Sequence, residues 1–247
     1  MTCRACGRAL RGQAASPWIT VRGAAYHRCA GCGHVRLEDA RAPSAPESKA
    51  RYELHRNDPA EPGYRRFLMS FIDRAVAPFV CSGARILDFG SGPVPALSVL
   101  LRERGMQVSA YDRFYAPDRR SLRGPFDLVA LHEVIEHLAR PYATLAALGR
   151  RLRPGGLIAI RTRFPPLEPE AFARWWYRED RTHVGFFGPP AFAAMAARIG
   201  AALVLCEAPD LGVLRLATLA LSSSLFRRRR PRQGHLRPGS SLSPCPC

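Results

Sequence analysis

The 247-residue chain is 47% hydrophobic, which is enough for one α/β core and a small accessory module and excludes a chain that is disordered throughout. The formal charge of +17 suggests nucleic-acid binding. However, Lys49 is the only lysine among 37 basic residues, and six arginines follow Phe226. We therefore attribute much of the charge to compositional bias and a basic tail, so nucleic acid is the less favoured partner.

The N-terminus does not resemble a secretion signal, because cysteines and arginines occupy the first ten residues where an apolar segment would be needed. The longest apolar stretch, residues 211–226, contains Arg215 and three serines and is too short to span a bilayer. We therefore expect a soluble cytoplasmic protein with no membrane partner and no disulfide framework.

Residues 1–40 contain two Cys-x-x-Cys-Gly pairs, formed by Cys3, Cys6, Cys29 and Cys32. Four thiolates are the tetrahedral ligand set of a structural zinc ion, so this segment is predicted to be a zinc ribbon. His27 and His34 are the nearby competing ligands. Redox chemistry is the weaker interpretation, because one such pair would suffice for it. Whether the ribbon reads nucleic acid, docks a protein or covers the next domain stays open.

Residues 41–82 are predicted to connect the ribbon to the main domain. The Pro- and Ser-rich stretch 41–48 indicates a linker. Apolar residues between 49 and 81 recur at helical spacing until Pro78 closes the pattern. We expect a linker followed by a helical cap.

From residue 83 to 222, short apolar strands alternate with helices. Strands are predicted at 85–89, 107–111, 126–131 and 157–162, helices at 94–104, 142–152 and 189–199, and an antiparallel edge hairpin at 202–206 and 213–218. This alternation predicts an α/β fold with a doubly wound, mostly parallel sheet. The low-complexity residues 223–247 are expected to form a basic disordered tail.

The most informative local motif is the run DFGSGP at residues 88–93, between a predicted strand and a predicted helix. Its glycines let the backbone approach a ligand, and the helix N-terminus attracts a negative group. Asp112 follows at the end of the next strand, where a carboxylate can accept hydrogen bonds from ribose hydroxyls. Spacing alone leaves three nucleoside cofactors open, NAD, FAD and S-adenosylmethionine, as well as a tight turn without a ligand.

Four ordered motifs narrow this choice: ILDFGSG at 86–92, YD at 111–112, FDLVALHEVIEHLARP at 126–141 and LRPGGLIAIRT at 152–162. Together they resemble the class I S-adenosylmethionine-dependent methyltransferases, most closely the subgroup of ubiquinone-type and other small-molecule methylases. The resemblance covers roughly residues 83–220 and implies a Rossmann-like methyltransferase fold.

The resemblance also implies a cofactor site. The residues implied for the methionine end are Asp88, Gly90 and Gly92. Asp112 would hold the ribose, Phe114 would lie against the adenine, and Glu133 would face both the cofactor and the reaction centre. Two features depart from the family pattern: Val94 stands where a third glycine is common, and the segment between Asp112 and Asp127 is short for a third strand.

The run HEVIEH at 132–137 is similar to a zinc-protease motif, but its histidines are five residues apart rather than four. On a helix this spacing places them on different faces, so they cannot share a metal ion there. We expect no metalloprotease site, and His137 is predicted to cap or pack against the following helix.

Two segments outside the core motifs, 51–58 and 175–183, are predicted to bind the methyl acceptor. The candidates for general base are His183 first and His55 second, since histidine titrates near neutral pH. The alternative for His183 is a hydrogen bond to a loop carbonyl. Trp175 and Tyr177 could stack on a flat acceptor or form core under the loop. Two further cysteines, Cys81 and Cys206, are expected to be buried.

The favoured function is methyl transfer from S-adenosylmethionine to a small molecule. The first alternative is a methylase of RNA or protein that holds its polymer with the ribbon and the basic tail. The second is a module that binds the cofactor without catalysis. An NAD-linked dehydrogenase is weaker, because the EVIEH and LRPGG runs do not fit one.

Overall fold

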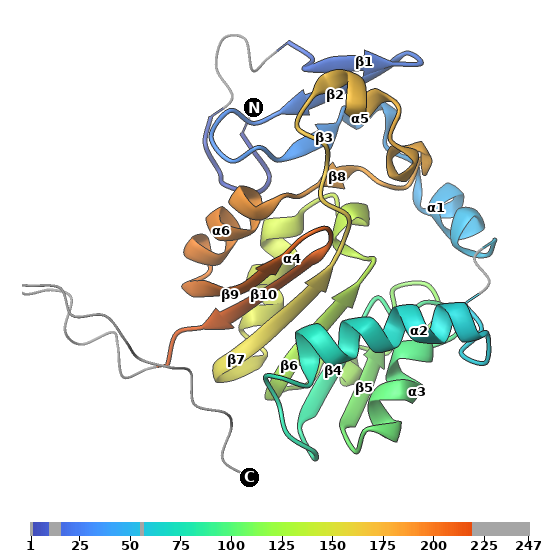
Figure 1. Ribbon diagram of the computed structural model, residues 1–247, viewed down its shortest axis with the longest axis vertical. Helices are drawn as coiled ribbons and strands as arrows, with labels where there is room; N and C mark the ends of the chain where they lie inside the picture. Colours follow the sequence, from blue (N-terminus) through green and yellow to red (C-terminus); the bar gives the residue numbers. More distant parts are fainter. Residues whose placement is uncertain (1, 10–15, 55–56, 219–247) are drawn as a thin grey trace, which may run out of the picture.

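The computed structural model describes residues 2–9, 16–54 and 57–218, so the predicted tail and His55 lie outside the described residues. At its centre is a six-stranded sheet in the order β5-β4-β6-β7-β10-β9. Its strands are β4 (Arg85–Phe89), β5 (Gln107–Tyr111), β6 (Phe126–His132), β7 (Leu152–Arg161), β9 (Ala201–Glu207) and β10 (Leu211–Leu216). The first four are mutually parallel, and β9 and β10 form an antiparallel hairpin beside β7. The predicted mostly parallel sheet is confirmed (Figure 1).

Helices pack on both faces of this sheet (Figure 1). They are α2 (Pro62–Phe71), α3 (Ala96–Glu103), α4 (Pro141–Gly149) and α6 (Pro189–Arg198). Successive side chains of a strand point to opposite faces, and β6 follows this rule. Leu128 and Ala130 pack with α2 and α3, whereas Val129 and Leu131 pack with α4 and α6. The inner strands β4 and β6 are mostly apolar because both of their faces are buried, whereas the edge strands β5 and β9 are partly exposed.

The single helix predicted over residues 49–81 is wrong. The chain instead forms α1 (Ala45–Tyr52), then α2, which continues into a π-helix at Ile72–Val76. Pro62 favours a new start, because proline fits the first turn of a helix but not its interior, and Glu61 caps α2. The helix α1 begins inside the predicted linker, because Ser44 and Glu47 form a capping box there.

The loop between β5 and β6 lacks the additional strand that a complete doubly wound sheet would have there. Between Asp112 and Phe126 it contains a 3-10 helix at Arg119–Leu122 and no strand. β5 therefore lies at one edge of the sheet, in agreement with the short spacing in the sequence. The helix predicted to reach residue 152 ends at Gly149, because β7 already begins at Leu152.

A second, four-stranded sheet lies above one end of the first (Figure 1). Its strands, in spatial order, are β1 (Ile19–Val21), β2 (Ala24–Arg28), β3 (Val35–Leu37) and β8 (Gly185–Phe186). The first three come from the cysteine-containing segment, but β8 comes from the C-terminal half. The short helix α5 (Pro169–Ala173) also packs here, with the Phe172 ring 5.1 Å from the Tyr26 ring. The ribbon and the segment 169–187 therefore form one packed unit.

Candidate functional site

A cavity of about 650 Å³ lies where β4, β5 and β6 end. In an open α/β sheet, ligands bind beyond the carboxyl ends of the strands, where neighbouring connections run in opposite directions. β5 and β6 flank β4 on opposite sides, so the cavity occupies this position. Both segments predicted to bind the acceptor contribute to its wall, and the Arg51 Nε donates to Asp180 Oδ2 between them at 2.9 Å.

The glycine loop after β4 forms the floor of the cavity. Gly90 and Gly92 have φ angles of +83° and +70°, a region that side-chain-bearing residues avoid. A Cβ atom at Gly90 would lie 2.6 Å from the Cγ2 of Val134, so this glycine is also required by packing. Val94, at the position of the missing third glycine, lines the cavity and is 42% exposed.

Asp88, at the end of β4, is almost fully buried beside the loop. Its Oδ2 accepts a hydrogen bond of 2.7 Å from the Ser98 hydroxyl. Burial outweighs this bond and raises the pKa of Asp88 to about 6. A positively charged group next to this carboxylate would stabilise its ionised form.

Asp112 joins the loops that follow β4 and β5. Its Oδ2 accepts from the Gly92 backbone N–H at 3.1 Å, and its Oδ1 accepts from those of Phe114 and Tyr115 at 2.8 and 3.2 Å. An ionised carboxylate has about four acceptor sites, so Oδ2 can accept another bond. Phe114 lines the cavity, with the Arg113 guanidinium 4.6 Å from its ring centre.

Glu133 follows β6 in an unusual backbone conformation. Its φ is +55°, which is strained for a residue with a side chain and is often found at functional sites. The conformation places Glu133 in the cavity wall, where its Oε2 lies 3.1 Å from the Tyr177 hydroxyl. The same hydroxyl lies 2.7 Å from Oε1 of Glu136, which is completely buried. Burial raises the pKa of both glutamates.

Of the two histidines predicted as general bases, His183 lies within the described residues and His55 does not. His183 lines the cavity and is 8% exposed, and its Nδ1 lies 2.6 Å from the Tyr177 carbonyl oxygen. This is the loop-carbonyl bond considered as its alternative. His137 contacts the loop before β8, where its Nδ1 lies 3.0 Å from the Thr182 carbonyl oxygen.

Several side chains differ from expectation or were not anticipated. Tyr177 is core, at 2% exposure, whereas the neighbouring Trp176 is 64% exposed and lines the cavity. Cys81 and Cys206 are exposed, not buried. Glu136 was missed as part of the site, although it lies in the EVIEH run. Its signal in the sequence was a second acidic residue, three positions after Glu133 and next to His137.

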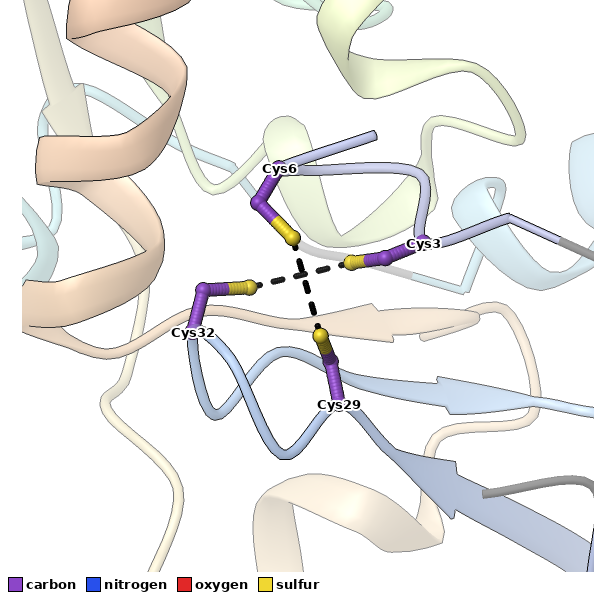
Figure 2. Close-up of side chains that lie close together, drawn as sticks. All are labelled: Cys3, Cys6, Cys29 and Cys32. Atoms are coloured by element: carbon purple, nitrogen blue, oxygen red, sulfur yellow. Dashed lines mark hydrogen bonds between the residues drawn. The ribbon is translucent and has the colours of Figure 1, made fainter. Parts of the chain in front are cut away.

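The four ribbon cysteines converge on one centre, as Figure 2 shows. The sulfur–sulfur distances are 3.7 Å for Cys3–Cys32 and 3.6 Å for Cys6–Cys29. A tetrahedral zinc site with Zn–S bonds of about 2.3 Å requires sulfur atoms roughly 3.8 Å apart. The donor set and spacing therefore fit zinc. His34 is next nearest, with its Nδ1 3.9 Å from the Cys3 sulfur.

A family model described as a methyltransferase domain matches residues 61–205. The match spans more than half of the chain, so the chain belongs to this methyltransferase family. No curated protein matches it.

Two solved structures are similar in fold. One is a chain in the complex between the Haloferax volcanii Trm112 methyltransferase activator and a methyltransferase, with 15% identity and a TM-score of 0.50 over 70% of this chain and 98% of that chain. The other is an O-methyltransferase family protein from Burkholderia thailandensis, with 14% identity and a TM-score of 0.50 over 73% of this chain and 65% of that chain. At these identities the likeness shows the fold alone. In the described part of the chain, no helix is long and apolar enough to cross a membrane.

Proposed function

We propose that the chain is an S-adenosylmethionine-dependent methyltransferase acting on a small molecule. The observation that carries this proposal is the position of the Asp112 carboxylate, which lines the cavity and binds the glycine loop. A carboxylate placed at the end of the second strand of a nucleotide-binding unit holds ribose hydroxyls. In a chain of the methyltransferase family, the fitting nucleoside is S-adenosylmethionine.

The cavity residues match the other parts of this cofactor. Asp88 and the positive-φ glycines Gly90 and Gly92 would receive the methionine end, where the buried carboxylate attracts the ammonium group. Phe114 would supply an apolar face for the adenine. When bound, the cofactor supplies a methyl group activated by a positively charged sulfur.

The chain's own part in catalysis is to position the acceptor, exclude water and accept a proton. We assign proton acceptance to Glu133, because its strained backbone and the Tyr177 hydroxyl fix its carboxylate at the cavity wall. His183 presents its ring to the same space. A cavity of about 650 Å³ is within the usual range for small-molecule sites, which supports a small acceptor beside the cofactor.

The four ribbon cysteines are proposed to hold a structural zinc ion. Their mutual distances support this assignment, and with four protein ligands the ion would have no open position. Its role would be to hold the small sheet on which β8 and α5 pack.

The test of the proposed function is calorimetric titration of the full chain with S-adenosylhomocysteine, the product form of the cofactor. We expect micromolar binding by the wild type and loss of binding in Asp112→Ala. The matched control is Asp118→Ala, because Asp118 pairs with Arg120 outside the cavity. Absence of binding by the folded wild type, or equal binding by both variants, would refute the proposal.

A further inference from the structure

Three potential metal ligands outside the ribbon lie together beside the cavity. Glu136, His137 and His183 each offer one ligand atom, and these atoms lie within 4.8 Å of one another. The His137 Nε2 is 3.8 Å from the Glu136 Oε1, and the two histidine rings are 4.7 Å apart. Both histidines line the cavity. The cluster joins the segment after β6 to the segment before β8.

The two histidines are oriented in the same way. In each ring Nδ1 faces a backbone carbonyl, that of Thr182 for His137 and that of Tyr177 for His183. A carbonyl oxygen only accepts hydrogen bonds, so Nδ1 carries the hydrogen in each ring, and in the neutral form of each ring the lone pair is on Nε2. Histidines that bind metals are held in this manner, with the second ring nitrogen donating to a carbonyl or carboxylate.

The charge around Glu136 supports a cation. Its side chain is completely buried, and its Oε2 has no hydrogen-bond partner among the described residues. The Tyr177 hydroxyl has one proton for both Glu136 and Glu133, and the Thr162 hydroxyl is a second donor beside Glu136. Arg161, the nearby buried cation, already pairs with Asp210 at 2.8 Å. Burying the ionised carboxylates of Glu133 and Glu136 side by side costs free energy unless a proton or a positive ion neutralises one of them.

We propose that Glu136, His137 and His183 bind a divalent transition-metal ion in the wall of the cavity. Two imidazole nitrogens and one carboxylate oxygen favour zinc, iron, cobalt or manganese over calcium and magnesium, which require mainly oxygen ligands. Three protein ligands leave at least one coordination position for another molecule. Provided that the proposed methyl transfer is correct, that position would bind a hydroxyl oxygen of the acceptor and lower its pKa.

The test uses the full chain with its ribbon loaded with zinc and no cofactor present, so its outcome is independent of methyl transfer. Cobalt(II) is titrated and followed by visible absorption, because nitrogen and oxygen ligands give weak bands whereas thiolates give intense charge-transfer bands. We expect one cobalt ion per chain with the weak spectrum. Glu136→Gln and His183→Gln should each weaken binding by at least about 100-fold, because loss of a group that only supports a ligand already costs about 10–100-fold.

Two control variants are matched to these changes. Glu170→Gln removes an exposed carboxylate, and His132→Gln removes a cavity histidine that packs between aromatic rings rather than in the cluster. Both should bind cobalt like the wild type, with circular dichroism and ribbon zinc content confirming the fold of every variant. The proposal is overturned if the folded wild type binds no second ion or shows only the thiolate spectrum. It is also overturned if both ligand variants bind as tightly as the controls.

Discussion

Replacing Gly90 by alanine tests the close contact between the glycine loop and Val134, in the segment after β6. The new Cβ would lie 2.6 and 2.9 Å from the two Cγ atoms of Val134, and the backbone φ is +83°. The left-handed conformation costs alanine about 1–2 kcal/mol, and the overpacking adds about 1–3 kcal/mol. We expect Gly90→Ala to lower the free energy of unfolding by about 2–5 kcal/mol.

A double-mutant cycle separates these two costs. Val134→Ala removes both clashing Cγ atoms, so the double variant should recover the overpacking term, with a coupling energy of about 1–3 kcal/mol. Gly92→Ala is the control for backbone strain alone, because its nearest neighbour would be the Asn57 Nδ2 at 3.7 Å. Urea unfolding, followed by circular dichroism, measures the free energy of unfolding of all four variants. Strictly additive costs for Gly90→Ala and Val134→Ala would refute the close contact.

Three further predictions concern other parts of the site. Because the folded-state pKa of Asp88 is raised to about 6, wild-type stability should fall by roughly 2 kcal/mol relative to Asp88→Asn as the pH rises from 4 to 7; parallel urea midpoints would contradict this. Tyr177→Phe removes the hydroxyl shared by Glu133 and Glu136 and should cost about 1–3 kcal/mol in urea unfolding, whereas an unchanged midpoint would show that the hydroxyl is not shared. Cys29→Ser, or removal of zinc by a chelator, should expose Tyr26 and its neighbours to solvent and weaken cofactor binding, as fluorescence and calorimetry would show; full binding without metal would exclude a structural role.

The sequence predicted the parts of the fold in which local chemistry and tertiary structure agree. The strand ending at Phe89 is largely apolar and buried, whereas the strand ending at Tyr111 lies at the edge and is half-buried, and each is followed by a cavity-lining residue that the sequence singled out, Gly90 and Asp112. The edge hairpin formed by β9 and β10 was also predicted correctly. The glycines after β4 were identifiable because only such residues adopt their positive φ angles easily.

Contacts between distant segments could not be predicted in this way. Glu136 and His183 meet because the segment before the two-residue strand β8 lies against the segment after β6, where the Val184 N–H donates to the Glu136 carbonyl oxygen at 2.8 Å. A strand as short as β8 has no periodicity to detect. The helix over residues 49–81 was predicted as continuous because apolar spacing carried more weight than Pro62. Cys81 and Cys206 are exposed because Cys81 lies in the turn before β4 and Cys206 lies on the edge strand β9.

The central claim is that the cavity beyond β4 and β5 binds S-adenosylmethionine. A crystal structure of the full chain grown with S-adenosylhomocysteine tests it most directly. We predict the ribose hydroxyls within hydrogen-bonding distance of the Asp112 carboxylate, the adenine against Phe114 and the amino-acid end beside Asp88 and Gly90. Ligand density elsewhere, or an empty cavity at saturating ligand concentration, would contradict the account.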